Sequence, residues 1–268
     1  MAKARARRQA KLRREKIAAA QRRAIEGPLP DFVVIGTQKG GTSYFYRLLT
    51  EHPLVRGAVA KELHFFDNKF SEGVGWYRRC FSEGKRVCGQ RTITGEASPS
   101  YLFDPQVPER MARIVPDARL IALLRNPVDR AYSHYQMEVR RGKEARSFEE
   151  ATQEEMSSAE SGGETVDVPH AYLRRGLYAE QLERFSFFAN RERLLVVKSE
   201  NLFTRRLDVL ESVLRFLRLP PFESTLAPSP AGRPTYEPMD PGTRRRLEGF
   251  FAPHNERLYD LLSTDFGW

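Results

Sequence analysis

A lysine inside a glycine-bearing turn is the residue of this chain best placed to do chemistry. Residues 31–49 read DFVVIGTQKGGTSYFYRLL, a short β-branched strand followed by a turn that holds Lys39 and then by a helix. Gly40 and Gly41 let the backbone approach an anion closely. The free N–H groups at the helix start, with the positive end of the helix dipole, favour a phosphate there. The segment predicts a phosphate-binding loop, and the alternative is a glycine-rich turn that binds nothing.

The loop matches neither of two common nucleotide-binding patterns. The triphosphate loop G-x-x-x-x-G-K-[ST] places its lysine directly before the helical Ser or Thr. Here that position is Gly41, and Lys39 lies two residues earlier. The dinucleotide fingerprint G-x-G-x-x-G fails because Gly36 is followed by Thr37 and Gln38 with no second glycine at the required offset. The pattern therefore disfavours an ordinary kinase or dehydrogenase.

A second set of polar residues follows another apolar strand. Residues 119–125 read RLIALLR, which predicts a buried strand that ends in Arg125, and the next helix begins at a proline and carries Ser133. In open parallel sheets, ligands bind beyond the carboxyl ends of the strands. Residues 36–42 and 125–133 can therefore face one crevice.

These residues need a sheet to position them. Strands alternate with helices along the chain, which predicts an α/β fold with a central parallel β-sheet flanked by helices in a single domain. Ser147 and Glu150 have the spacing of a capping box at the start of a helix. The other expected elements are extended segments at 61–67, 94–98 and 193–202 and helices at 73–81, 106–114, 128–139, 147–158, 178–188, 204–217 and 242–262. Residues 220–241, with seven prolines, are expected to be irregular.

The net charge of +9 belongs to one end of the chain. Residues 1–23 hold ten Lys and Arg and one acidic residue, Glu15, so that residues 24–268 are formally neutral. We expect residues 1–26 to form a flexible basic tail and residues 27–268 to form the domain. A tail of this kind is a solvated arm or, alternatively, a loosely helical arm that touches anionic lipid or nucleic acid. The neutral body argues against specific binding of nucleic acid.

The cysteines and the apolar runs indicate in which cellular compartment the protein is expected. Cys80 and Cys88 lack the paired C-x-x-C spacing of a zinc site, and no metal is expected. The only apolar stretch of the tail, residues 17–20, is shorter than the roughly 7 to 15 residues of a signal-peptide core. No apolar run approaches the roughly 20 residues of a membrane span. We expect a cytoplasmic protein with two free thiols, a Cys80–Cys88 bridge being the alternative.

Together these segments resemble the sulfotransferases that use 3′-phosphoadenosine 5′-phosphosulfate, and most closely the heparan sulfate N- and 3-O-sulfotransferase branch with its bacterial relatives. Four segments carry the resemblance, and weaker similarity continues through RLLVVKSENL and NERLYDLLSTDFGW. The four are IGTQKGGTSYFYRLL (35–49), KELHFFD with GVGWYRRCF (61–81), TGEASPSYL (94–102) and LLRNPVDRAYSHY (123–135).

For the donor, the resemblance implies a P-loop-like sulfotransferase fold that needs no metal. Lys39 would contact the phosphate and the bridging oxygen of the phosphosulfate, where negative charge develops as sulfur transfers in line. Arg125 and Ser133 match the positions that bind the 3′-phosphate, for which a guanidinium is well suited. The remaining donor contacts would come from Gly40, Gly41, Thr42 and Ser43, with Gly232 and Arg233 as further candidates.

For the acceptor, the resemblance assigns Glu62 as the general base that takes a proton from a hydroxyl or amine. Its alternative role is an ion pair with Lys61. His64 and Asp67 match positions that line the acceptor site, and His64 is also a catalytic candidate. A lone histidine between apolar neighbours is, alternatively, a core residue.

One departure affects the acceptor. The family's E-K-[ST] pattern reads Glu96-Ala97-Ser98 here, so a lysine that helps to hold the acceptor is missing. The acceptor itself, a sugar, a lipid or another small metabolite, is not specified by these residues. The alternatives to a sulfotransferase are a nucleotide kinase and a nucleotide-binding module docked through the basic tail.

Overall fold

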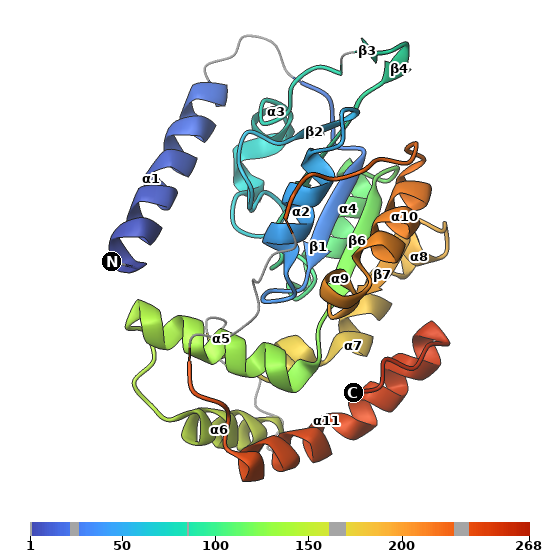
Figure 1. Ribbon diagram of the computed structural model, residues 1–268. Helices are drawn as coiled ribbons and strands as arrows, with labels where there is room; N and C mark the ends of the chain where they lie inside the picture. The colour runs from blue at the N-terminus through green and yellow to red at the C-terminus, as the bar shows by residue number, and fades with distance from the viewer. Residues whose placement is uncertain (1, 22–26, 85, 161–169, 228–235) are drawn as a thin grey trace.

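Five parallel strands form the centre of the protein. In the computed structural model, which describes residues 2–21, 27–84, 86–160, 170–227 and 236–268, the strands lie in the order β2-β5-β1-β6-β7 (Figure 1). Their bounds are β1 Phe32–Gly36, β2 Val55–Gly57, β5 Ile93–Ala97, β6 Arg119–Leu124 and β7 Leu194–Lys198. The prediction of a single α/β domain with a central parallel sheet is confirmed.

The central strand β1 is covered on both faces. Side chains alternate across a strand, so Val33 and Ile35 enter one apolar cluster while Phe32 and Val34 enter another on the opposite face. All four are fully buried. This explains the continuous apolar run FVVI, which is typical of a parallel strand buried on both sides.

Helices cover the two faces and the carboxyl end of the sheet (Figure 1). On one face lie α2 (Thr42–Thr50), α9 (Asn201–Thr204) and α10 (Arg206–Leu217). On the other lie α3 (Gly73–Arg78), α4 (Val107–Ile114), α7 (Tyr178–Glu183) and α8 (Ser186–Ala189). Helices α5 (Pro127–Arg141), α6 (Phe148–Glu160) and α11 (Pro241–Leu262) share a third cluster beyond the carboxyl ends of the strands. The remaining elements are the short helices η1 (Phe70–Glu72) and η3 (Arg174–Gly176) and the hairpin of β3 (Arg86–Val87) and β4 (Gln90–Arg91).

Two helix starts near the site follow from the sequence. Asn126 caps α5, because its side chain accepts hydrogen bonds from the backbone N–H groups of Val128 and Asp129. At α6, the Ser147 N–H donates to Glu150 and the Glu150 N–H donates to the Ser147 hydroxyl. This reciprocal pair confirms the predicted capping box.

Two local predictions were wrong, and one element was not predicted. The expected helix over 178–188 is broken into α7 and α8, with Phe185 as the residue before the second helix. The extended segment expected at 61–67 is a loop, and the strand of that region is the shorter β2. The β3–β4 hairpin was not predicted, because its strands of two residues each show no usable alternation.

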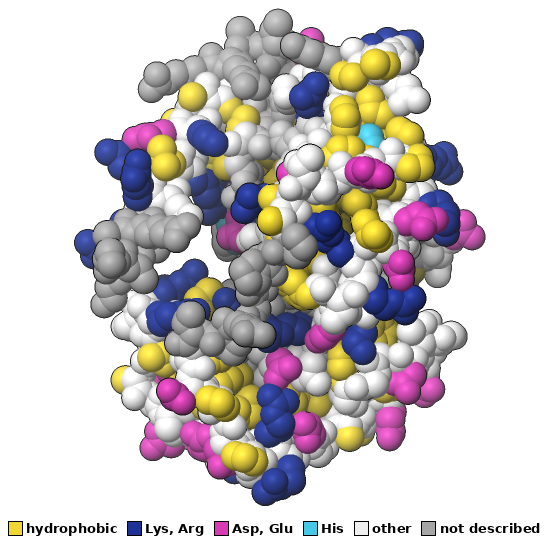
Figure 2. Space-filling model, in the orientation of Figure 1, with side chains coloured by type: hydrophobic (Ala, Val, Ile, Leu, Met, Phe, Trp, Pro, Cys, Tyr) yellow, Lys and Arg dark blue, Asp and Glu magenta, His cyan; other side chains and the backbone are white. Residues whose placement is uncertain are grey.

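Helix α1 (Ala2–Gln21) occupies most of the basic N-terminal segment. Ile17 and Ala20 are 8% and 2% exposed, and the Gln21 side chain donates to the carbonyl of Trp76 on α3. Figure 2 shows Lys and Arg side chains along α1 at the left, while both signs of charge are interspersed over the rest of that face. The end of the helix therefore packs on the body, and the flexibility of residues 1–26 stays a prediction. No helix among the described residues is long and apolar enough to cross a membrane.

Candidate active site

The loop between β1 and α2 is fixed to the ends of two neighbouring strands. The Thr37 N–H donates to the Leu123 carbonyl of β6 at 2.8 Å, and the Ser199 hydroxyl, just beyond β7, donates to the Gly40 carbonyl at 2.9 Å. A Cβ on Gly40 would lie 2.7 Å from the Leu123 carbonyl oxygen. Gly41 has a φ of 79°, a left-handed conformation that glycine adopts without strain. Both glycines are therefore required by the path of the loop.

Lys39 lies in a group of like charges. Its Nζ is 3.8 Å from the sulfur of Met137 on α5, and the guanidinium of Arg125 donates to its carbonyl at 3.3 Å. Burial and four arginines lower the pKa of Lys39 to about 8. These are Arg140, Arg125, Arg141 and Arg130. Cations held together in this way create a field that favours a bound polyanion.

Arg130 adds a buried charge to this group. Its side chain is fully buried, it donates to the Tyr172 carbonyl, and its Nε and one Nη find no partner among the described residues. Burial lowers its pKa, and the positive charge of Arg125 adds to that effect. The positive field around the glycine loop therefore has a contribution from a buried position of α5 as well as from exposed arginines.

Arg125 and Ser133 lie on the same side of the sheet as the loop. Arg125 directly follows β6, and its carbonyl accepts a hydrogen bond from the Tyr178 hydroxyl at 2.8 Å. Ser133 is 7% exposed and lies on α5, two turns into the helix. Thr42 is buried and Ser43 is exposed at the start of α2. The candidates Gly232 and Arg233 lie outside the described residues.

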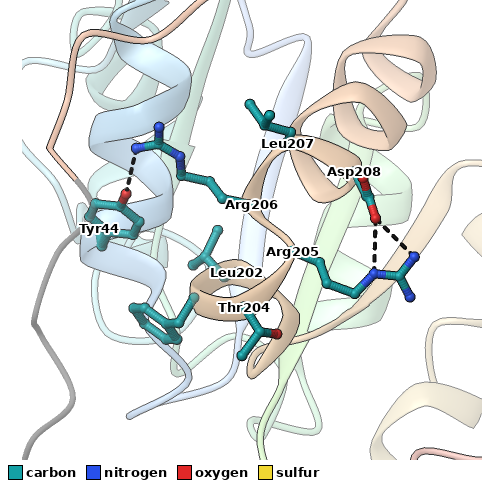
Figure 3. A pocket seen from close by; sticks show the side chains of 8 residues that line it. Tyr44, Leu202, Thr204, Arg205, Arg206, Leu207 and Asp208 are labelled. Carbon is teal, nitrogen blue, oxygen red and sulfur yellow. Dashed lines mark hydrogen bonds and ion pairs between the residues drawn. The ribbon is translucent and has the colours of Figure 1, made fainter.

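A pocket beside the glycine loop is lined by aromatic rings (Figure 3). Tyr44 and Phe203 are nearly parallel, with 5.9 Å between their ring centroids and 23° between their planes. Arg206 donates to the Tyr44 hydroxyl at 3.3 Å, and Phe203 is the nearest neighbour of the position that a Cβ on Gly41 would take. The volume is about 350 Å³. Sequence reasoning missed this pocket, since its two rings are far apart in the chain.

The three predicted acceptor-site residues lie together and form a charged relay. The His64 imidazole lies 2.8 Å from an Asp67 oxygen through Nδ1 and 3.8 Å from a Glu62 oxygen through Nε2. The other Glu62 oxygen accepts from Lys61 at 2.8 Å. Asp67 also accepts from the Ser100 hydroxyl. The predicted alternative for Glu62, an ion pair with Lys61, is therefore present together with the contact to His64.

The relay changes the titration of its members. Burial would raise the pKa of Glu62, but hydrogen bonds with His64 and Lys61 outweigh burial and hold that pKa well below its ordinary range. Burial would lower the pKa of His64, but the Asp67 and Glu62 carboxylates outweigh it and raise that pKa to about 9. Glu62 is therefore ionised and His64 protonated near neutral pH.

A cavity of about 300 Å³ joins this relay to the glycine loop. Gln38 of the loop lines it together with His64 and Asp67. On the opposite wall, α5 contributes His134 and Glu138. A reactant in this cavity would therefore touch both the loop that carries Lys39 and the relay that carries Glu62.

His134 and Glu138 were not singled out from the sequence, although their i,i+4 spacing places them on one helix face. They are 1% and 3% exposed. One Glu138 oxygen pairs with Arg141 at 2.8 Å, while its other oxygen and the Nδ1 of His134 find no partner among the described residues. Burial, together with nearby cations led by Arg130, lowers the pKa of His134 well below its ordinary value. The neutral imidazole and the carboxylate can both accept hydrogen bonds.

The departure at Ala97 removes a side chain from this region. Ala97 is fully buried, and its carbonyl accepts the N–H of Glu62 at 2.9 Å. Cations reach the cavity from other positions, among them Arg141 and Lys143.

No group of three or more His, Cys, Asp or Glu that could hold a metal ion occurs within the described parts of the chain. Cys80 and Cys88 are both free thiols, so the alternative of a bridge between them was wrong.

Comparison with known proteins agrees with this architecture. Residues 29–228 match the sulfotransferase domain family. Heparan sulfate glucosamine 3-O-sulfotransferase 5 of Homo sapiens is 31% identical over 265 residues, which cover 90% of this chain and 74% of that protein. Heparan sulfate glucosamine 3-O-sulfotransferase 6 of Homo sapiens is 30% identical and covers 89% of this chain and 73% of that protein.

A solved structure gives the same result. The crystal structure of a sulfotransferase from Alicyclobacillus acidocaldarius superposes with a TM-score of 0.72 at 30% identity, covering 89% of this chain and 98% of that one. These matches favour the sulfotransferase over the kinase and the non-enzymatic module that the sequence had left open. The chain therefore belongs to the sulfotransferase family and is a sulfotransferase.

Proposed function

We propose that this enzyme transfers a sulfuryl group from 3′-phosphoadenosine 5′-phosphosulfate to a hydroxyl or amine of a carbohydrate or small metabolite. The observation that carries the proposal is the group of cations around the glycine loop, in which Lys39 and Arg125 lie at the ends of adjacent strands. Cationic side chains that follow two different strands suit a nucleotide phosphorylated at both ends. A mononucleotide would leave one of them without a partner.

The residues present fit this donor. Lys39 and the backbone of Gly40 and Gly41 would hold the 5′-phosphosulfate, and Arg125 with Ser133 would hold the 3′-phosphate. The aromatic pocket of Tyr44 and Phe203 borders Gly41 and suits a purine, since rings of this kind stack on bases. When bound, the donor supplies the sulfuryl group that is transferred.

Lys39 has an electrostatic role in this proposal. Its ammonium is held in a partly buried loop whose backbone is fixed by Leu123 and Ser199. A fixed cation stabilises negative charge that develops on a leaving oxygen, and it does so without reorganising during the reaction. The surrounding arginines lower the pKa of Lys39, so a bound anion would raise that pKa again and keep the ammonium charged.

Glu62 would take the proton of the acceptor. Its carboxylate is ionised, its side chain is 42% exposed, and its partner His64 lines the cavity. Protonated His64 holds it in place and is itself held by Asp67. An acceptor that displaces Lys61 from Glu62 would remove one of the causes of the low pKa and make Glu62 a stronger base at the moment of transfer.

The acceptor would bring its own hydrogen-bond donors. His134 and Glu138 both line the cavity wall, and a neutral imidazole and a carboxylate each have an atom that accepts hydrogen bonds. A sugar, which carries several neighbouring hydroxyl or amine groups, suits such a polar wall, whereas a phenol has only the hydroxyl that is consumed. The names of the relatives, heparan sulfate glucosamine 3-O-sulfotransferases, also point to a carbohydrate. A screen of sugars, amines and phenols with labelled donor identifies the compound.

Binding of nucleotides tests the donor. We expect 3′,5′-adenosine bisphosphate to bind about 10- to 100-fold more tightly than 5′-AMP, the value of hydrogen bonds to a charged group. Arg125→Ala should remove that preference in calorimetric titrations. Arg215→Ala, which removes an exposed arginine paired with Glu211, is the control and should retain it. Equal affinity of the wild type for both nucleotides would sink the proposal.

A further inference from the structure

The loop of residues 61–67, called the acceptor loop below, lies over a buried carboxylate. This carboxylate takes no direct part in the reaction proposed above. Glu96 is the penultimate residue of β5 and is fully buried. One of its oxygens accepts the hydroxyls of Tyr77 at 2.7 Å and Tyr101 at 3.0 Å, and the other accepts the hydroxyl of Ser98 at 2.8 Å. Burial raises the pKa of Glu96, and the hydrogen bonds from the three hydroxyls oppose that rise. In its ionised form the carboxylate only accepts hydrogen bonds, and in that form each of the three hydroxyls spends its single hydrogen on Glu96.

Two of these hydroxyls have a second partner in the acceptor loop. The Ser98 oxygen accepts the backbone N–H of His64 at 3.2 Å, and the Tyr101 oxygen accepts the backbone N–H of Phe65 at 2.8 Å. With their hydrogens directed at Glu96, both hydroxyls can offer only lone pairs to the loop. The hydrogen bonds therefore run in one direction, from loop amide to hydroxyl to carboxylate.

The loop needs such support because its backbone is strained. Glu62 and His64 have φ values of 63° and 56°. Residues other than glycine are disfavoured in this left-handed region, and they persist there when the surrounding structure holds them. The N–H groups of Glu62, His64 and Phe65 are held by β5 and the turn after it, through the Ala97 carbonyl and the two hydroxyls.

We propose that Glu96 is a positioning residue of the active site: by orienting the Ser98 and Tyr101 hydroxyls toward the loop, it holds Glu62 and His64 in the conformation that forms the relay. Tyr77 shares the same carboxylate oxygen and contacts neither loop amide by hydrogen bonding. The role of Glu96 as support for catalysis rests on the proposed function, whereas its hold on the loop conformation does not.

The two tyrosines provide a matched pair of variants. Both are fully buried, both donate to the same oxygen of Glu96, and each loses one hydroxyl on replacement by phenylalanine. We expect Tyr101→Phe to lower the pKa of His64 from about 9 toward its ordinary value, because the loop shifts and the contact with Glu62 and Asp67 weakens. Tyr77→Phe should leave that pKa unchanged. Titration of the His64 imidazole by NMR measures both without any substrate.

Transfer kinetics give the second readout. With labelled donor and an N-sulfated heparan oligosaccharide as the acceptor probe, Tyr101→Phe and Glu96→Gln should lower kcat about 10-fold or more, one hydrogen bond to a charged group being worth that factor. Tyr77→Phe should stay within about 2-fold of the wild type, and all three should bind 3′,5′-adenosine bisphosphate as the wild type does. In Glu96→Gln the amide must donate to one of the hydroxyls, which reverses the direction of that hydrogen bond.

The outcomes separate the two proposals. Equal shifts of the His64 pKa in Tyr77→Phe and Tyr101→Phe, or a wild-type titration in Glu96→Gln, would overturn the positioning role even if transfer is observed. An absence of transfer by the wild type, with the expected difference in titration, contradicts the proposed function with this acceptor and leaves the positioning role supported. Thermal unfolding of each variant is the control for stability. If both tyrosine variants lose similar stability, a difference between their His64 titrations does not come from a general loss of stability.

Discussion

The donor side and the acceptor side of the active site handle charge in opposite ways. On the donor side, Lys39 and its neighbouring arginines carry one sign, and Glu138 is paired with Arg141 at the edge of this group. On the acceptor side, Glu62, His64 and Asp67 alternate in sign and neutralise one another. The first arrangement has an unfavourable self-energy that a polyanion relieves. The second is already satisfied, so an acceptor must compete with contacts that exist.

The backbones of the two loops are held by different groups. The donor loop has left-handed residues at Lys39 and Gly41, with φ values of 72° and 79°, and it is bonded to the ends of β6 and β7 through the Leu123 carbonyl and the Ser199 hydroxyl. The acceptor loop has left-handed residues at Glu62 and His64, and the hydroxyls of Ser98 and Tyr101 accept two of its N–H groups. We infer that the acceptor side depends more on side-chain supports than the donor side does. Three measurements test this difference between the two sides.

The largest effect is expected on the acceptor side. Glu62→Gln keeps the shape of the side chain and removes its ability to accept a proton, so kcat should fall about 10²- to 10⁴-fold. Affinity for 3′,5′-adenosine bisphosphate should not change, because Glu62 is not among the donor-side cations. Steady-state kinetics and calorimetry measure the two quantities. Glu72→Gln, an exposed carboxylate after the loop, is the control, and full activity in Glu62→Gln would exclude Glu62 as the base.

A smaller effect is expected from the titration of Lys39 on the donor side. Its pKa of about 8 leaves a fraction of the lysines uncharged at pH 8.5, and a bound bisphosphate raises that pKa. Binding should therefore take up a proton, and affinity should fall as the pH rises above 8, by up to about tenfold per unit. Calorimetry in two buffers of different ionisation enthalpy detects the uptake. Lys39→Arg retains the charge and should bind without proton uptake; the absence of any buffer dependence in the wild type would contradict the prediction.

The smallest effect is expected where α1 meets the acceptor side. Ile17 joins the cluster that contains Trp76 and Phe65, and Phe65 belongs to the acceptor loop. Ile17→Ala should weaken the docking of α1 by about 2 kcal/mol, which hydrogen exchange of residues 7–21 detects as faster exchange. Leu12→Ala, which removes an apolar side chain that is 48% exposed on the same helix, is the control and should exchange as the wild type does. Bisphosphate affinity should be unchanged in both. Identical exchange in the two variants would show that this face does not hold the helix.

The sequence predicts the donor side better than the acceptor side, for a physical reason. The strands around FVVIG and RLIALL are apolar on both faces, and the residues that follow them must lie at the carboxyl edge of the sheet. Arg125 and the glycine loop could therefore be placed without coordinates. The aromatic pocket could not, because Tyr44 and Phe203 meet only through tertiary packing.

The acceptor loop shows the limit more sharply. Its residues were identified through the resemblance, but KELHFFD was expected to be extended, and the left-handed conformations of Glu62 and His64 have no signature in residue type. Glu96 had been noted only for the lysine missing after it. Its three hydroxyl partners come from α3 and from the turn after β5, which nothing local could bring together.

The position of β1 in the strand order has a consequence for how the enzyme can be altered. It lies between β6, which leads to Arg125, and β5, whose end supports the acceptor loop. In the proposed site, Arg125 therefore lies on one side of β1 and the relay lies on the other, while α5 lines the acceptor cavity through His134 and Glu138. We infer that the segment from β2 through α3, the end of β5 and these two positions of α5 form one exchangeable unit. Transplanting that unit from a related enzyme should change which compound is sulfated while the nucleotide preference stays with the host.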